Sequence, residues 1–224
     1  MQTIHIVNQP FQLDSPIKKW ILVLIATGFL SLIMFAPGFK LALLIAGAIA
    51  LGCGCTYLLL LKATVKYTLT ATHFQQHLFH GGWVVKWSDI IDIGVCQYQH
   101  QGWHHPLPWI GIKLKRYSPY LDSICPRIAS QILLDQRSLL FLGLRQHNQH
   151  KFFEDRVLDT EVFIADNGRQ YKGLLAMLAN RMGYQRNNYG YDVFISASDL
   201  DRPIDEFVGL LRRYLAAADQ ERNG

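Results

Sequence analysis

Residues 20–61 read WILVLIATGFLSLIMFA-PGFK-LALLIAGAIALGCGCTYLLLL, which is two apolar runs separated by a four-residue break. As α-helices the runs would measure about 25 Å and about 31 Å, against a bilayer hydrocarbon core of roughly 30 Å. The short break leaves room only for an antiparallel pair. The sequence therefore predicts a transmembrane helical hairpin over residues 20–61, between an N-terminal cytoplasmic tail (1–19) and a cytoplasmic domain (62–224).

The lysines around this hairpin predict its orientation. Lys18, Lys19, Lys62 and Lys66 flank its two outer ends, whereas Lys40 alone lies at its tip. Cytoplasmic flanks of membrane spans carry the excess of lysine and arginine. We therefore expect a multi-pass membrane protein with both termini in the cytoplasm.

Small residues follow one face of the second run. Ala46, Ala50 and Gly54 repeat every four residues, and this spacing lets two helix backbones approach closely in a bilayer. The neighbour on this face is either the first run or a second copy of the protein, so a homo-oligomer stays open. Neither run contains an ionisable residue apart from thiols and one tyrosine, which gives no indication of an ion or proton pathway.

The net charge of +5 is concentrated near the predicted membrane segment. Residues 1–62 contain four lysines and one aspartate, and the rest of the chain carries 18 basic and 16 acidic residues. A nucleic-acid-binding domain normally shows a basic stripe, so we expect no nucleic-acid partner. The four cysteines form no C-x-x-C pair. This spacing supports neither a disulfide framework nor a zinc site, and it is typical of a reducing compartment.

Alternating apolar and polar residues predict five short strands between residues 64 and 116. The five expected strands are Val65 to Leu69, 74–80, Trp83 to Trp87, Ile91 to Val95 and Ile110 to Leu114. The expected connections are a tight turn at Gly81-Gly82 after the second strand, a bend at Ser88-Asp89 after the third, and a loop over 97–109 after the fourth. This spacing is typical of a curled antiparallel sheet.

Residues 117–190 predict a largely helical insertion, because the alternation stops near Arg116 and returns at Tyr191. Within the insertion, the run 139–144 fits either a buried strand or a helical turn. The triplet Asp166-Asn167-Gly168 is typical of a turn, and Gly183 is a candidate helix end. After a strand at 191–195, one apolar helix face is predicted from Ile204, Phe207, Val208, Leu211 and Leu215.

Two sets of motifs resemble known families. The segments Y67-T-L-T, G81-G-W and W87-S-D-I-I-D-I resemble the bacterial membrane-tethered pleckstrin-homology-like (PH-like) domains, in which a transmembrane hairpin precedes the domain. The whole chain also resembles an uncharacterised family of proteobacterial inner-membrane proteins through four further segments: S123-I-C-P-R-I-A, D135-Q-R, G173-L-L-A-M-L-A-N-R-M and S198-D-L-D-R-P. The first resemblance implies a PH-like barrel, and the second implies a bacterial inner-membrane location.

The expected fold class is therefore an α+β membrane protein. A two-helix transmembrane hairpin is followed by a PH-like antiparallel barrel, which contains the helical insertion at about 117–190 and ends in a closing C-terminal helix.

Two groups of residues are candidate sites. His73, His77, His80, His104 and His105 could lie near one another, but no carboxylate or thiol accompanies them at a metal-ligand spacing, so no metal site is predicted. The loop 97–109 carries Trp103 and Trp109, and Lys113, Lys115 and Arg116 follow it. These five residues are candidate contacts with the membrane or with a partner, because tryptophan favours the membrane interface and cations favour anionic lipids.

No catalytic motif is found in the sequence: it has no G-x-S-x-G, no phosphate-binding loop, no H-E-x-x-H and no dinucleotide fingerprint. We therefore predict no catalytic residues, no cofactor and no enzymatic activity. The expected function is to present a cytoplasmic PH-like domain to a protein partner or to lipid headgroups. Two alternatives remain open, a membrane-associated enzyme with its site in the insertion and a small accessory subunit of a larger membrane complex.

Overall fold

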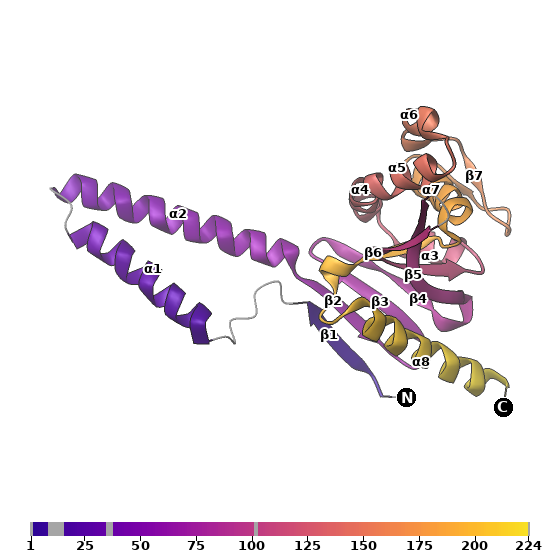
Figure 1. Ribbon diagram of the computed structural model, residues 1–224, viewed down its shortest axis with the longest axis horizontal. Coiled ribbons are helices and arrows are strands. Elements are labelled where there is room, and N and C mark those ends of the chain that lie inside the picture. Colours follow the sequence, from indigo (N-terminus) through magenta and orange to yellow (C-terminus); the bar gives the residue numbers. More distant parts are fainter. Residues whose placement is uncertain (1, 9–15, 35–37, 101–102, 224) are drawn as a thin grey trace. The chain divides into compact units, whose positions relative to one another are not determined.

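The computed structural model describes residues 2–8, 16–34, 38–100 and 103–223, and Figure 1 shows their helices and strands. The chain divides into two compact units. One unit comprises Met1–Asn8 together with Val65–Gly224, and the other comprises Gln9–Thr64.

The Gln9–Thr64 unit contains α1 (Pro16–Met34) and α2 (Phe39–Ala63), which contact each other. Of the described helices, α2 alone is long and apolar enough to cross a membrane, whereas the shorter apolar stretch Leu22–Ser31 belongs to α1. The hydroxyls of Thr27 and Thr56 donate to carbonyls in the preceding helical turn, so these polar groups are satisfied without water. One candidate span is therefore supported, in place of the two predicted ones.

The first sheet of the other unit is antiparallel and has the order β1-β2-β3-β4. Its strands are β1 (Ile4–Asn8), β2 (Val65–Leu69), β3 (His73–Leu78) and β4 (Gly81–Lys86). The turn between β3 and β4 lies two residues earlier than predicted. Leu78 pairs with Gly81, so Phe79 and His80 form the turn and the two glycines begin β4. A side chain at Gly82 would overlap the carbonyl of Gln76, which explains the glycine there.

The strand β1 lies in the segment 1–19, which was predicted to be a tail. It pairs with β2 from Ile4↔Leu69 to Asn8↔Val65. Two side-chain hydrogen bonds fix it to distant parts of the chain: Asn8 Nδ2 donates to the Ser198 carbonyl (2.6 Å), and the Tyr214 hydroxyl donates to the Gln2 carbonyl (2.8 Å). Residues 4–8 therefore belong to the folded domain.

A short 3-10 turn, η1 (Trp87–Asp89), separates the first sheet from the second, at the predicted bend. The second sheet has the order β5-β6-β9 and consists of β5 (Ile90–His100), β6 (Trp103–Leu114) and β9 (Val193–Ser196). The predicted return of the chain to the sheet after the insertion is confirmed, because Ile195 of β9 pairs with Ile110 of β6.

The predicted closed barrel is wrong for the described strands. A barrel requires continuous strand pairing around its circumference, but β4 and β5 are neighbours in sequence and end up in different sheets. The trajectory changes at η1, where Asp89 is buried and accepts a hydrogen bond from Arg116 (2.6 Å). The fold is therefore mixed α+β with open antiparallel sheets.

The insertion is mainly helical, as predicted, and Figure 1 shows its helices α4–α7 gathered together, away from α8. Its elements are α3 (Ser118–Ser123), α4 (Pro126–Asp135), α5 (Arg137–Gln146), η2 (His150–Phe152), α6 (Phe153–Val157), β7 (Phe163–Ile164), β8 (Gln170–Tyr171) and α7 (Leu174–Tyr189). The run 139–144 is helical, and the turn at Gly168 joins β7 to β8. The helix α7 continues through Gly183 and ends at Gly190, whose φ of +81° suits a glycine.

After η3 (Ala197–Asp199), the chain ends in α8 (Ile204–Asn223), which contacts β5, β6 and η1. Phe207 and Leu211 are fully buried and Val208 nearly so, as the apolar face predicts. The ring of Phe207 packs edge-on against Tyr67, which stacks on Phe74, and Phe74 stacks on Trp87. The helix α8 therefore completes an aromatic core between the two sheets.

A buried carboxylate joins the insertion to the second sheet. Asp192 accepts hydrogen bonds from the Leu114 backbone N–H (2.7 Å) and the Tyr117 hydroxyl (2.7 Å), and it forms an ion pair with Arg186 of α7. Arg186 also donates to the Leu114 carbonyl. Charge-assisted bonds of this kind fix the angle at which α7 meets the sheet.

Candidate binding groove

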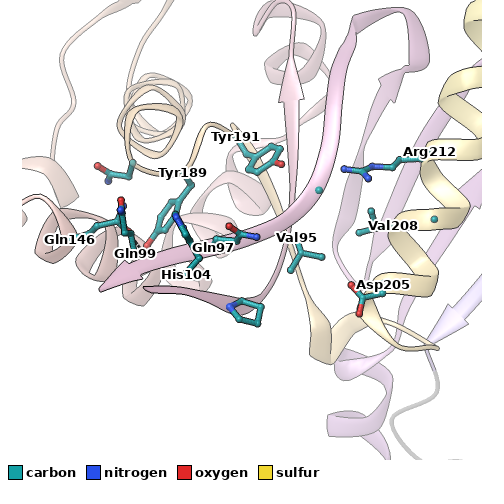
Figure 2. A pocket seen from close by; sticks show the side chains of 14 residues that line it. Val95, Gln97, Gln99, His104, Gln146, Tyr189, Tyr191, Asp205, Val208 and Arg212 are labelled. Carbon is teal, nitrogen blue, oxygen red and sulfur yellow. Dashed lines mark hydrogen bonds between the residues drawn. The ribbon is translucent and has the colours of Figure 1, made fainter. Parts of the chain in front are cut away.

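A groove of about 810 Å³ follows the outer edge of β5. One wall is α8, through Asp205, Val208, Gly209 and Arg212. The opposite wall comes from α5, α7 and the short segment after α7: Gln146, Asn188, Tyr189 and Tyr191. Figure 2 shows Val95 of β5 between these walls, with Arg212 and Val208 on one side and Gln99 and Gln146 on the other.

One of the two tyrosines in this groove, Tyr191, lies flat on the second sheet. Gly94 and Gly111 are paired across β5 and β6, and a methyl group on either one would overlap the ring or hydroxyl of Tyr191. The two glycines therefore make space for the ring. Burial raises the pKa of Tyr191, as does the charge of Asp92, while Arg212 opposes the shift. The hydroxyl is thus a neutral hydrogen-bonding group at neutral pH.

Two side chains bind the outer edge of β5 at either end of the groove. Arg212 Nε donates to the Ile93 carbonyl (2.7 Å), and the Gln99 backbone N–H donates to Gln146 Oε1 (3.1 Å). Arg212 also lies 4.0 Å from Asp92, which offsets part of its charge. Apart from Asp205 and Arg212, the lining consists of amides, tyrosines, glycines, valines, His104 and Pro106. The groove is suited to hydrogen bonding and close apolar contact.

Beneath the groove, α5 and α7 cover the outer face of the second sheet. Cys96, Leu139 and Phe194 form a small apolar cluster, and Trp109 and Tyr189 pack against it. Burial raises the pKa of the Cys96 thiol well above its ordinary value, so this cysteine is unreactive and structural. The cluster fixes the wall that carries Tyr189.

The residues predicted to contact a membrane or partner do not form one patch. Trp103 is 74% exposed at the start of β6, whereas Trp109 packs on the Cys96 cluster. Lys115 donates to the Ser88 carbonyl and Arg116 to Asp89, beyond the other end of β6. Lys113 is partly covered. At about 3.4 Å per residue, Trp103 and Lys113 are separated by roughly 34 Å along one strand.

The predicted loop 97–109 is largely strand. β5 extends to His100 and β6 begins at Trp103, so the described residues form a long hairpin arm. Two prolines lie in the part of β6 that precedes its pairing with β9, which starts at Trp109. Pro106 and Pro108 are tolerated there because a proline N atom needs no partner on an unpaired side of a strand.

Three of the five candidate histidines form side-chain hydrogen bonds. His77 Nε2 bonds to the Thr68 hydroxyl, His73 Nδ1 bonds to those of Thr70 and Thr72, and His80 bonds to Arg127. Among the residues that the structure describes, no group of three or more His, Cys, Asp or Glu side chains could hold a metal ion.

The small residues predicted to pack in the membrane lie on α2, where Ala46 is partly covered, whereas Ala50 and Gly54 are exposed.

The insertion contains a buried polar group that was not predicted from the sequence. Arg181 of α7 is 1% exposed, and burial, together with the charge of Arg137, lowers its pKa to about 10. Its Nη2 donates to the Val157 carbonyl, while its Nε and Nη1 and both polar atoms of the buried Gln185 lack a partner among the described residues. Because these atoms are sealed from solvent, they offer no entry for a ligand.

Taken together, the two units define a mixed α+β protein with one candidate membrane helix and a groove at a sheet edge. The chain belongs to the DUF2982 family, described as "Protein of unknown function (DUF2982)", which matches residues 67–217. No curated protein and no solved structure matches the chain. The family match begins after α2, so it covers most of the folded domain but neither β1 nor the apolar helices.

Proposed function

We propose that this chain is a non-catalytic inner-membrane protein whose cytoplasmic domain binds a protein partner in the β5 groove. The observation that supports this function most directly is the groove itself. It combines a strand edge, neutral hydrogen-bonding side chains and two tyrosines, a composition that recurs where proteins recognise other proteins. Its lining holds one carboxylate and one guanidinium, which is poorly suited to anionic headgroups.

A PH-like scaffold is part of this proposal. The domain has four strands in one sheet, three in the next and a C-terminal helix packed against both, which supports a PH-like scaffold whose two sheets do not close into a barrel. Two differences stand out. The strand β1 is separated from β2 by the apolar helices, and the insertion lies between β6 and β9.

The pairing of β1 with β2 supports a two-helix anchor. Asn8 and Val65 are paired, so the chain leaves the domain and re-enters it at the same place. If α2 crosses the bilayer, the segment before it must also cross, because otherwise residues 4–8 and 65–69 would lie on opposite sides. The 19 residues of α1 span about 28 Å as a helix, close to the hydrocarbon thickness. With the lysine asymmetry, this favours two spans and cytoplasmic termini.

Topology reporters provide the first prediction. Alkaline phosphatase fused after Lys40 is expected to be active, and the same enzyme fused after Gly224 inactive, because only the hairpin tip would reach the periplasm. A fluorescent protein that folds only in the cytoplasm should give the reverse pattern. Phosphatase activity at Gly224 would overturn the orientation, and inactivity at both positions would show that α2 does not cross.

Photocrosslinking in native membranes tests partner binding. A photoreactive residue in place of Gln97, an exposed residue of the groove, is expected to capture one partner in near-stoichiometric yield. The matched control is the same residue in place of Gln170, which is exposed on β8 outside the groove. The purified partner should also bind the full-length protein reversibly. Absence of a product at Gln97, or the same products from both positions, would contradict the proposal.

Photoreactive residues placed on the face of α2 formed by Ala46, Ala50 and Gly54 extend this experiment to the two alternatives. A partner captured only from the Ala46, Ala50 and Gly54 face would favour an accessory subunit or a homo-oligomer, since this small-residue face is largely uncovered. If neither Gln97 nor this face of α2 captures a protein, the result favours the alternative of an enzyme with its site in the insertion.

A further inference from the structure

We propose that the groove binds an extended peptide segment of the partner, which pairs with the outer edge of β5 as an additional strand. This inference rests on the proposed function and specifies the form of the ligand. It follows from the direction of the backbone groups of β5, from the side chains at the two ends of its edge, and from a glycine in α8.

The hydrogen-bonding pattern shows which β5 residues face outward. In the second sheet β6 is central, and the Ile112 carbonyl accepts from Asp192 N–H on the β9 side. Its pair on β5, Ile93, therefore directs its backbone groups away from β6, and its carbonyl indeed binds Arg212. Two residues further along, Val95 faces outward by the same alternation. Beyond the irregularity between Val95 and Gln97, the outward N–H of Gln99 indicates that Gln97 also faces outward.

The ends of this edge are capped and its middle is open. Arg212 binds the Ile93 carbonyl and Gln146 binds the Gln99 N–H, whereas Val95 and Gln97 between them line the groove. Proteins usually protect a free strand edge, because its unpaired backbone groups pair readily with another chain. In this protein the protecting side chains lie only at the two ends of the groove. The outward-facing backbone groups of Val95 and Gln97 can therefore form hydrogen bonds with the backbone of an extended peptide.

A glycine in the α8 wall is the second observation. Gly209 lies within a 20-residue helix, and a Cβ atom there would meet no atom within 4 Å. Nothing in the described chain therefore requires a glycine, although glycine weakens a helix interior. Close approach of a peptide backbone to the helix accounts for it, since any side chain would occupy the groove.

The lining also indicates the chemistry of the peptide. Side chains on one face of an added strand would meet the α8 wall at Gly209, beside the largely buried Val208, and those on the other would meet Tyr189, Tyr191 and Gln146. A largely uncharged segment with an apolar side chain toward α8 and hydrogen-bonding side chains toward the tyrosines fits this lining. At about 3.4 Å per residue, a segment of about seven residues covers the edge from Ile93 to Gln99.

The test uses full-length protein in nanodiscs and a displayed library of random peptides about ten residues long. Selected peptides are then synthesised, and their affinity and the hydrogen exchange of the β5 amides are measured. We expect the amides of Val95 and Gln97 to become protected when peptide binds. We expect Gly209→Leu to weaken binding by about tenfold or more by steric exclusion, with a melting temperature no lower than that of the wild type.

Gly183→Leu is the matched control, because Gly183 is also a mid-helix glycine facing open space but lies outside the groove. It should leave peptide affinity unchanged. Failure to select any peptide, peptides that leave Val95 and Gln97 unprotected, or equal affinity for the wild type and Gly209→Leu would each overturn the strand-pairing inference. Crosslinking from Gln97 is independent of these outcomes, since a folded partner surface in the groove would still be captured there.

Discussion

Leu211→Asp is expected to unfold the domain formed by the two sheets. Leu211 is fully buried on the face of α8 that packs against the sheets, next to Phe207 and Tyr214. A carboxylate at this position would be buried without a partner, which costs several kcal/mol. The total stability of such a domain is about 5–15 kcal/mol. Limited proteolysis and thermal melting of the full-length protein in nanodiscs would report the loss of structure.

The control for this variant is Arg213→Asp, two residues further along the same helix. Arg213 is exposed, and its replacement should change the free energy of unfolding by less than about 1 kcal/mol. Arg212 is less suitable, because it binds the Ile93 carbonyl. Equal protease resistance of the two variants would mean that α8 contributes little to the core, contrary to its packing on β5 and β6.

Long elements with strong periodicity could be predicted from the sequence. The apolar face of α8, the strand β2, the last part of β6 from Ile110 to Leu114 and the return of the chain at β9 all follow from patterns repeated over several residues. These patterns reflect burial on one side, so tertiary packing reinforces them. The position of η1 was also predictable, because Ser88-Asp89 interrupts an alternation that continues on both sides.

Features that depend on long-range pairing could not be predicted. The strand β1 has five residues, and only its contact with β2, about sixty residues away in sequence, distinguishes it from a tail. The split into two sheets depends on whether β4 and β5 pair, and their local sequences do not determine this. The arm formed by β5 and β6 was hidden by its prolines, which are usually a signal for loops and are compatible here because one side of β6 is unpaired.

The candidate groove was missed for the same reason, since its walls come from β5, β6, α5, α7 and α8. Of the five contact residues predicted from the sequence, Trp103 and Lys113 lie at opposite ends of one strand. Three signals were nevertheless present in the sequence. Gly94 and Gly111 interrupt strand patterns, which suggests close approach by another group, and Gly209 interrupts a helix whose other residues favour helix formation.

The ion pair between Arg186 and Asp192 supplies the other prediction with a large effect. Arg186→Met is expected to lower the free energy of unfolding by about 3–5 kcal/mol, because it leaves a buried charge without its partner. The Asp192 side chain is completely buried, and it would retain only the Leu114 N–H and the Tyr117 hydroxyl as hydrogen-bond donors. The contact of the Arg186 guanidinium with the Tyr117 ring would be lost as well. Chemical denaturation of the full-length protein in nanodiscs would measure the change.

Arg202→Met is the matched control, because it removes the same functional group from an ion pair that solvent reaches. Arg202 binds Asp201 with two hydrogen bonds, and both side chains are partly exposed. Such pairs contribute about 0–1 kcal/mol, so this variant should denature close to the wild type. The difference between the two variants measures the effect of burying Asp192. If they denature alike, the Asp192 carboxylate must reach water in solution, and the insertion would then be held to the sheet mainly by the apolar cluster around Cys96 and Phe194.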